Sequence, residues 1–179
     1  LVGYGPDPNA VVEEVLEIKN LTCLMGNHDY AVIGRMSLET FNGDAKRSLL
    51  YHEKVLSASN RDFIKTLPSK TKVRGEATMA HGSPRDPLWE YILNGTTASL
   101  NFDHFDTLWC FVGHTHIQSV FTLNPENGRV TVSQTQPDVT LSLQPKQILN
   151  PGSVGQPRDR DPRAAYAIYD TQARTWTPK

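Results

Sequence analysis

The chain is 179 residues long, and its 18 basic and 19 acidic side chains give a formal net charge of −1 at pH 7. This length fits one domain with a single core, spanning residues 1–179. The balanced charge argues against a broad nucleic-acid-binding surface. No run of about 18 apolar residues is present, so no membrane-spanning helix and no membrane partner are expected.

The two cysteines, Cys23 and Cys110, both lie in apolar segments. Cysteine is among the most frequently buried residues, so we expect two buried free thiols rather than a disulfide or a metal site. Free thiols are typical of a reducing compartment, which favours the cytoplasm.

A first helix is predicted to begin at Asp7 and Pro8, because aspartate can cap the first turn of a helix and proline fits within it. Its inward face is expected to be an apolar stripe. That stripe consists of Val11, Val12, Val15, Leu16 and Ile18.

Residues 21–25 form a short apolar segment, which predicts a buried strand that ends at the polar turn Gly26–Asp29. Helices are predicted over residues 44–57 and 60–67. His52 lies within the first of these two helices, and we interpret it as a surface or packing residue rather than a ligand.

Strands over residues 70–74 and 77–80 are expected to pair and to turn at Gly75, and His81 directly follows the second strand. Residues 83–91 then predict a loop that enters a short helix.

Candidate substrate contacts lie in this loop and in a later charged segment. Arg85 can clamp a phosphate, because a guanidinium group matches two phosphate oxygens at once. Trp89 and Tyr91 can face a base or a leaving group, although ordinary core packing is the preferred interpretation of both. Arg158, in the charged segment 156–161, is the remaining candidate.

The apolar residues 108–112 predict another buried strand, and Gly113–His116 follows it. In extended backbone, residues i and i+2 point to the same side, so His114 and His116 are expected to face one place. Two neutral imidazoles arranged in this way favour a transition-metal site. The alternative is a surface turn that happens to hold two histidines.

The last third of the chain predicts mainly strands. They cover residues 119–123, 129–132, 139–143, 147–149, 164–169 and 174–177. The first two are expected to form a hairpin around Asn127-Gly128, and the last two form another. The middle two are expected to continue the sheet.

Four times, a short apolar run ends in a polar turn that contains glycine. These turns are Gly26–Asp29, His81–Pro84, Gly113–His116 and Asn150–Gly155. In open α/β sheets, ligands bind beyond the carboxyl ends of the strands. The four turns are therefore expected to contribute to one shared site.

In this order, the motifs GNHD (Gly26–Asp29), HG (His81-Gly82), GHTH (Gly113–His116) and NPGSVG (Asn150–Gly155) resemble those of the calcineurin-like metallophosphoesterases. The resemblance is to the small bacterial and archaeal phosphodiesterase branch, and it covers most of the chain. It implies an α/β fold with two packed mixed β-sheets flanked by helices.

The resemblance also implies an N-terminal βαβ unit ahead of Leu1, on the order of 30 or more residues. The family opens with a strand bearing Asp-x-His and a strand ending in Gly-Asp, and Leu1–Gly3 resembles the residues just after that Gly-Asp. In the phosphoprotein phosphatases, an aspartate shortly after Gly-Asp orients the catalytic histidine. Gly3 matches that place here, so this pair is not expected.

Metal ligands carry over from the family residue by residue. Asn27, His81 and His114 would hold one metal ion, and His116 would face a second ion, whose remaining ligands would lie ahead of Leu1. A mixed shell of histidine, asparagine and carboxylate suits Mn, Fe or Zn better than Ca or Mg. The implied cofactors are therefore two divalent transition-metal ions.

The implied activity is hydrolysis of a small phosphate ester, as a phosphodiesterase or a phosphatase, by a metal-activated hydroxide. His28 would stabilise or protonate the leaving oxygen as general acid, and Asp29 would fix the tautomer of His28. Arg85, Trp89 and Arg158 would contact the substrate. Two alternatives stay open: an inactive binding scaffold of the same fold, and a mononuclear zinc hydrolase in which His116 has no role.

Overall fold

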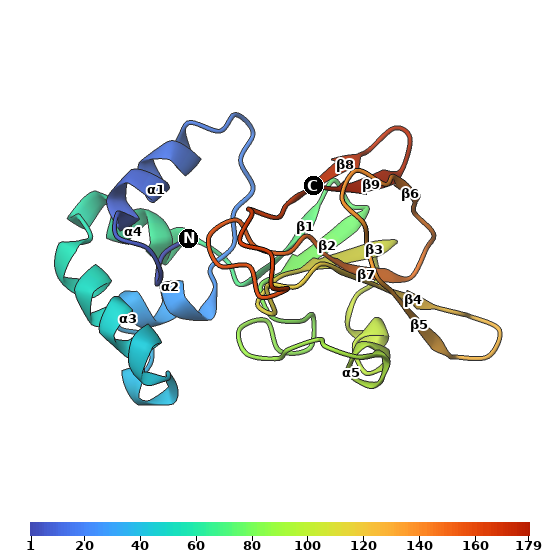
Figure 1. The fold of residues 1–179 in the computed structure, drawn as a ribbon, viewed down its shortest axis with the longest axis horizontal. Helices are drawn as coiled ribbons and strands as arrows, with labels where there is room; N and C mark the ends of the chain where they lie inside the picture. Colours follow the sequence, from blue (N-terminus) through green and yellow to red (C-terminus); the bar gives the residue numbers. More distant parts are fainter. The chain divides into compact units, whose positions relative to one another are not determined.

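A computed structural model describes residues 1–179, which form two compact units, residues 1–69 and 70–179. The first unit is helical, and the second contains all nine strands (Figure 1). Each unit has its own hydrophobic core. One domain spanning residues 1–179 therefore stays a prediction. None of the helices has the length and apolar character that crossing a membrane requires.

The helical unit contains four α-helices and one 3₁₀ helix. They are α1 (Pro8–Leu16), α2 (Asn27–Val32), η1 (Leu38–Thr40), α3 (Gly43–Val55) and α4 (Ala58–Thr66). Helix α3 contacts both α1 and α2. The core between the helices consists of Val2, Val12, Ala31, Val32, Leu49, Leu56 and Ile64.

Local sequence explains where α3 and α4 begin. The Asn42 side chain accepts a hydrogen bond from the Ala45 N–H at 2.9 Å, and the Ser57 hydroxyl accepts one from Asn60 at 3.3 Å. Such side-chain caps satisfy N–H groups that a helix start leaves without partners. The predicted ranges 44–57 and 60–67 thus match two real helices within about two residues.

Helix α1 differs from its prediction in which residues it buries. Val12 is fully buried, but Val11, Leu16 and Ile18 are exposed. The helix is only nine residues long and packs on α3 and α4 through a narrow face, so the predicted stripe was too wide. The Asp7 side chain occupies the N-cap position but makes no capping hydrogen bond.

The strand predicted over residues 21–25 is absent. Strands form only where backbone groups pair with a neighbouring strand. Here the Met25 N–H donates instead to the Pro68 carbonyl at 2.8 Å, outside any sheet. The predicted turn Gly26–Asp29 is instead the start of α2, with Gly26 at the N-cap position and Asn27, His28 and Asp29 in the first turn of the helix.

The sheet unit contains nine strands, one α-helix and one 3₁₀ helix. They are β1 (Lys70–Val73), β2 (Ala77–Ala80), α5 (Gly95–Ser99), η2 (Phe102–His104), β3 (Trp109–Val112), β4 (Ser119–Leu123), β5 (Val130–Ser133), β6 (Leu141–Ser142), β7 (Gln147–Asn150), β8 (Ala167–Asp170) and β9 (Thr175–Pro178). The three predicted hairpins are confirmed as β1–β2, β4–β5 and β8–β9. The short helix expected within residues 83–91 is absent, and α5 begins later, where the Asn94 side chain caps it.

Two sheets pack against each other, as expected. The larger has the order β1-β2-β3-β7-β4-β5, with β2, β3 and β7 parallel and the other pairs antiparallel. The smaller, β6-β9-β8, is entirely antiparallel, so the expectation of two mixed sheets was right only for the larger one. Residues 139–143 supply β6 to the smaller sheet and do not continue the larger one.

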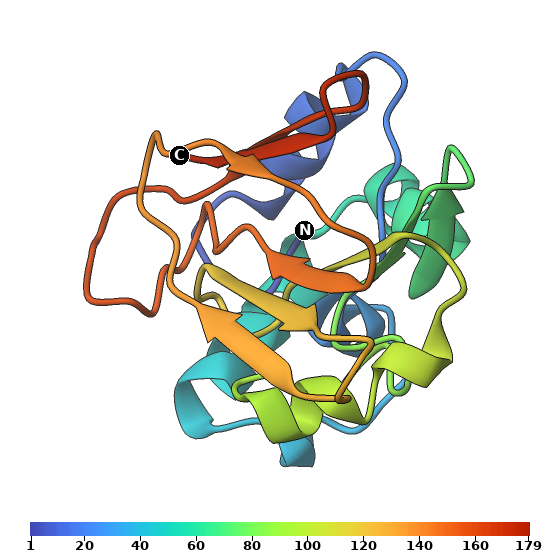
Figure 2. The same ribbon diagram turned by 90° about the vertical axis from the view of Figure 1, so that its right-hand side faces the viewer.

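The side chains of β3 point alternately to the two faces of the larger sheet, and each face has its own hydrophobic core. Trp109 and Phe111 pack with Trp176 of the smaller sheet, whereas Cys110 and Val112 face the cluster that includes α5. Successive strand side chains point to opposite faces, which produces this division. Figure 2 shows the β8–β9 hairpin and α5 on opposite sides of the larger sheet.

Both cysteines are free, as predicted, but only Cys110 is buried, whereas Cys23 is half-buried. Burial raises the pKa of the Cys110 thiol to about 12, although Lys70 opposes the shift. Cys110 therefore stays protonated at physiological pH and packs as a small apolar residue.

Candidate metal site and active site

Three parallel strands present their following residues at one edge of the larger sheet. The register pairs Ala80 of β2 with Val112 of β3, and Phe111 with Leu149 of β7. Parallel strands in this register end at the same edge, so residues just beyond them become neighbours. The turns after β2, β3 and β7 therefore lie at one edge of the sheet, as expected, and their use as a shared site stays a prediction.

His81 and His114 are brought into contact at this edge. Nε2 of His81 lies 3.1 Å from Nδ1 of His114, and the Gly113 N–H donates to the His81 carbonyl at 2.9 Å. Two nitrogens that bind one metal ion at about 2.0–2.1 Å lie about 2.8–3.0 Å apart in octahedral geometry and about 3.3–3.4 Å apart in tetrahedral geometry. The observed separation fits two ligands of a single ion.

The Gly113–His116 turn is not extended, which corrects the prediction. His114 and His116 have φ angles of 62° and 61°, in the left-handed region. Residues other than glycine rarely adopt this conformation, which costs on the order of 1–3 kcal/mol and is concentrated at functional sites. The two imidazoles therefore do not face one place because of a strand alternation; the turn directs each ring separately.

Asn150 holds this strained turn in place, a role that sequence reasoning did not assign. Its side-chain amide donates to the Gly113 carbonyl at 2.7 Å and to the Thr115 hydroxyl at 2.9 Å. Its carbonyl oxygen accepts from the Gly152 N–H at 2.9 Å. The side chain is buried, and its position opening the NPGSVG motif was the available signal.

His116 is oriented by the loop that follows β7. Its Nδ1 lies 2.7 Å from the Gln156 carbonyl, which can only accept, so Nδ1 carries the proton and Nε2 holds the lone pair. Metal-binding histidines are commonly oriented by such a bond. Burial, and then the charge of Arg158, lowers the pKa of His116, which favours the neutral ring that a metal requires.

The two predicted substrate-binding arginines already have protein partners. Arg158 donates to the Gln156 side chain at 2.8 Å and thus lies on the loop that orients His116. Arg85 forms an ion pair with Glu90, which also accepts hydrogen bonds from Ser83 and Asn101, each at 2.7 Å. A substrate would have to compete for both guanidinium groups.

Two aromatic side chains border His114. The Tyr91 ring stacks on it, with centroids 3.8 Å apart and planes 25° apart, and Trp89 meets its edge at 6.4 Å. Tyr91 is partly exposed, so it covers one face of the imidazole without being a core residue. Contact of Trp89 with a substrate stays a prediction.

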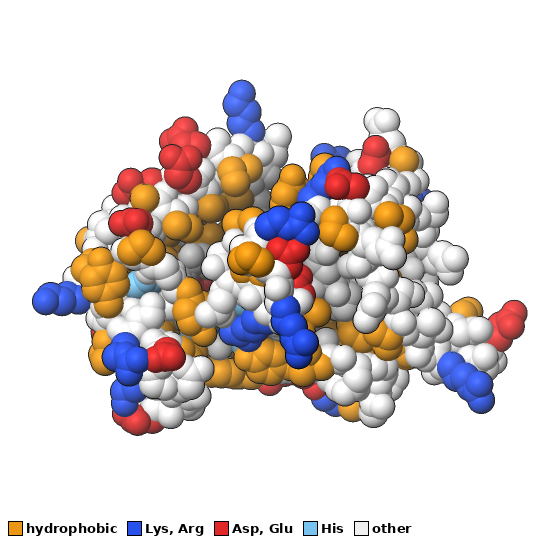
Figure 3. Space-filling model, viewed as in Figure 1, with side chains coloured by type: hydrophobic (Ala, Val, Ile, Leu, Met, Phe, Trp, Pro, Cys, Tyr) orange, Lys and Arg blue, Asp and Glu red, His pale blue; other side chains and the backbone are white.

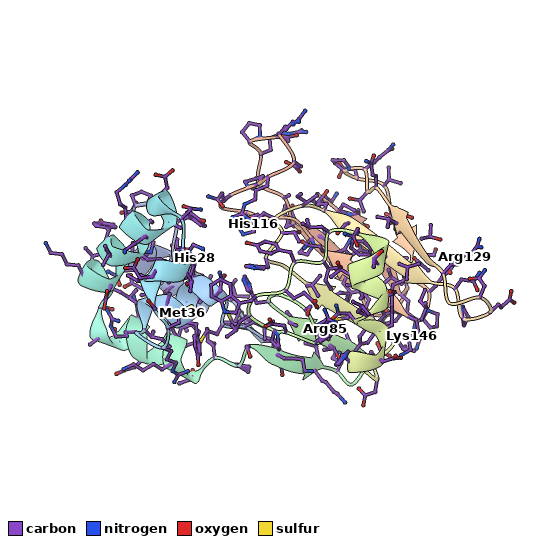
Figure 4. All side chains as sticks on the ribbon, turned by 90° about the horizontal axis from the view of Figure 1, so that it is seen from below. His28, Met36, Arg85, His116, Arg129 and Lys146 are labelled. Carbon is purple, nitrogen blue, oxygen red and sulfur yellow. The ribbon has the colours of Figure 1, made fainter.

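In the helical unit, His28 lies in α2 between two aromatic rings. The Tyr4 ring centroid is 4.5 Å and the Phe41 centroid 5.0 Å from that of His28. Figure 4 labels His28 on this unit, and labels Arg85 and His116 on the sheet unit.

Asp29 fastens the start of α2. Its carboxylate accepts hydrogen bonds from the Gly26 N–H at 2.8 Å and the Val2 N–H at 3.0 Å. Its predicted action on the His28 tautomer stays a prediction.

Asn27 is the first residue of α2 and is buried. Across residues 1–179, no three side chains of the types His, Cys, Asp and Glu are grouped closely enough to hold a metal ion. An ion bound to His81 and His114 would therefore need further donors, such as amide oxygens, to complete its coordination shell.

On the face shown in Figure 3, lysine and arginine are interspersed with aspartate and glutamate. Many of them form exposed pairs, such as Lys72 with Asp106 and Arg163 with Asp161.

Comparison with known proteins gives consistent matches. Residues 3–174 match the calcineurin-like phosphoesterase superfamily domain. The chain is 37% identical over 176 residues to the uncharacterised protein MJ0912 of Methanocaldococcus jannaschii, covering 95% of this chain and 68% of that protein.

Two solved structures have the same fold. A metallophosphoesterase from Sphaerobacter thermophilus has a TM-score of 0.86 and 40% identity, covering 98% of this chain and 72% of that one. The hypothetical protein PH1004 from Pyrococcus horikoshii OT3 has a TM-score of 0.74 at 18% identity, with coverages of 99% and 70%.

Proposed function

This chain belongs to the calcineurin-like phosphoesterase superfamily, and we propose that it hydrolyses a small phosphodiester with the help of two divalent transition-metal ions. The observation that carries the proposal is the approach of His81 Nε2 to His114 Nδ1, 3.1 Å apart at the carboxyl edge of β2 and β3. Manganese is the first ion to test, and the two free cysteines favour a cytoplasmic location.

The donor chemistry of the sheet unit supports metal binding. His81 and His114 offer two nitrogens at ligand spacing, and His116 presents the lone pair of Nε2. By resemblance to the family, Asn27 of the GNHD motif is a further proposed metal ligand. Bound ions of this kind polarise phosphoryl oxygens and lower the pKa of water.

The remaining chemistry falls to His28. Departure of an alkoxide needs a proton, and histidine donates one efficiently near pH 7. The Tyr4 and Phe41 rings restrict the orientation of His28, which suits a group that must keep a fixed direction toward a leaving oxygen. Asp29 is the proposed group that fixes its tautomer.

The first experiment separates metal binding from proton donation. Full-length protein is incubated with Mn²⁺ and bis(p-nitrophenyl) phosphate, and metal content is measured for each variant. We expect His81→Ala and His114→Ala to lose metal and activity together. His28→Ala should keep the metal and lose about 10²–10⁴-fold in turnover of substrates with poor leaving groups.

His104→Ala is the matched control, because His104 is an exposed histidine of the same unit. It should retain both metal and activity. If the wild-type protein binds metal but hydrolyses no phosphate ester, the enzyme proposal is wrong and a binding scaffold of this fold is the better description. Loss of metal in His28→Ala would instead overturn the role given to His28.

A further inference from the structure

His52 is a fully buried histidine of α3 with a hydrogen-bond partner on each ring nitrogen. The Gly3 N–H donates to Nδ1 at 2.9 Å, and Nε2 lies 2.8 Å from the Gly5 carbonyl. Since an amide N–H can only donate and a carbonyl can only accept, the ring is neutral with its proton on Nε2. His52 therefore holds the backbone on both sides of Tyr4.

The segment held by His52 lies directly against His28. Tyr4 contributes the ring that packs on His28, with the planes tilted by 40°. Gly3 has a φ of 112°, and a Cβ added there would be 2.2 Å from Nδ1 of His28. Glycine is needed at this position because both the backbone conformation and the close approach exclude a side chain.

We propose that His52 is a positioning residue for His28 and acts through residues 3–5. It fixes Gly3 and Tyr4 on one side of the His28 ring, while Phe41 closes another side at 5.0 Å. This inference rests on the proposed function, in which His28 protonates the leaving oxygen. His52 itself touches neither substrate nor metal in this role.

The position of a general acid affects the rate most when the leaving group needs a proton in order to depart. An acid must be within hydrogen-bond reach of the oxygen that it protonates, and a displacement of about 1 Å can cost on the order of 10²-fold in rate. A p-nitrophenolate leaves readily without a proton, whereas a phenolate or an alkoxide does not. Misplacement of His28 should therefore slow esters with poor leaving groups selectively.

Three variants isolate the two hydrogen bonds. His52→Phe keeps an aromatic ring in the buried site and removes both bonds. His52→Gln keeps one acceptor and one donor, separated much as the two ring nitrogens are, and can restore both. Tyr51→Phe is the control from the same helix, because it removes the exposed hydrogen bond from Tyr51 to the Pro6 carbonyl and leaves residues 3–5 held.

Full-length protein with Mn²⁺ is assayed on methyl p-nitrophenyl phosphate and methyl phenyl phosphate. We expect His52→Phe to lower kcat for the phenyl ester by about 10- to 100-fold and for the nitrophenyl ester by less than about threefold. His52→Gln and Tyr51→Phe should keep the wild-type ratio of the two rates. Partial unfolding does not affect this ratio, because both rates scale with the same folded fraction.

A second readout needs no activity. In protein labelled with ¹³C-histidine, the Cε1–H resonance of His28, assigned by its loss in His28→Ala, reports the ring current of Tyr4. It should move in His52→Phe and stay in place in His52→Gln and Tyr51→Phe.

An unchanged rate ratio in His52→Phe overturns the positioning role, as does an unmoved His28 resonance. If His52→Phe does not fold, Gly3→Ala displaces the same segment with His52 intact, and an unchanged ratio there also overturns it. If the wild-type protein hydrolyses no ester, the proposed function is wrong. The His28 resonance then still tests whether His52 positions His28.

Discussion

Asn150 is a buried side chain whose amide group joins the turn after β3 to the turn after β7. We expect Asn150→Leu to lower the free energy of unfolding by about 1–3 kcal/mol, because the Gly113 carbonyl and the Gly152 N–H lose their partner. We also expect metal affinity to fall by about 10- to 100-fold, since the turn that carries His114 is no longer held. Urea unfolding and titration calorimetry with Mn²⁺ measure the two effects.

The control for this variant is Asn127→Ala at the exposed end of the β4–β5 hairpin, where Asn127 accepts a hydrogen bond from the Arg129 N–H at 3.0 Å. Figure 4 shows Arg129 at this outlying position. Asn127→Ala removes a hydrogen bond of the same type at a place away from the histidines, and it should leave metal affinity unchanged. Wild-type metal affinity in Asn150→Leu would contradict the holding role.

The pKa of Glu90 leads to a prediction of how the free energy of unfolding depends on pH. Partial burial alone would raise its pKa, but hydrogen bonds from Arg85, Asn101 and Ser83 bring it to about 2, against an ordinary value of 4.5. A lowered folded-state pKa stabilises the protein above about pH 4.5, and this contribution is lost as the pH falls toward 2. It amounts to at most about 3 kcal/mol.

The measurement is the melting temperature of wild type and Glu90→Gln between pH 7 and pH 2. We expect wild type to be the more stable at pH 7 and the difference to shrink steadily below about pH 5. A difference that stays constant across this range would show that the Glu90 charge does not contribute.

Two adjacent leucines of α3 allow a direct test of how this helix packs. Leu49 is 0% exposed and Leu50 is 49% exposed, although the two leucines are adjacent in the same helix. Leu49→Ala should cost about 2–5 kcal/mol, because it leaves a cavity in the core of the helical unit. Leu50→Ala should change stability by no more than about 0.5 kcal/mol. Chemical unfolding of both variants decides, and equal losses would contradict the assigned burial.

Sequence periodicity predicted some of the helices correctly and failed to predict which side chains of others are buried. Spacing predicted α3 and α4 well because each has a capping side chain and an apolar face. The wide stripe of α1 failed because burial depends on which neighbours a helix meets. The missing strand at residues 21–25 failed for a related reason: an apolar pentapeptide becomes a strand only when another strand pairs with it.

For the whole molecule, charge balance leads to a prediction about partners. The net charge is −1, and positive and negative side chains are interspersed on the face shown in Figure 3. Nucleic-acid affinity depends on neutralising many phosphates with clustered lysine and arginine. We therefore expect no retention on heparin and no shift of a DNA duplex at physiological salt; binding to either would overturn this view.

The sequence by itself determined the family, the two-sheet α/β architecture and the turns that carry His28, His81 and His114. The motifs are short-range signals, each readable over a few positions, and their order carries the family resemblance, which in turn implies the two-sheet architecture.

Only the tertiary structure decided which groups meet. The register of β2 against β3 brings His81 to His114, and the buried bonds of Asn150 and His52 join residues about 35 to 50 positions apart. The left-handed φ angles of His114 and His116 likewise depend on partners supplied by distant strands and loops. Such contacts arise from packing and strand register, and local propensity carries no information about them.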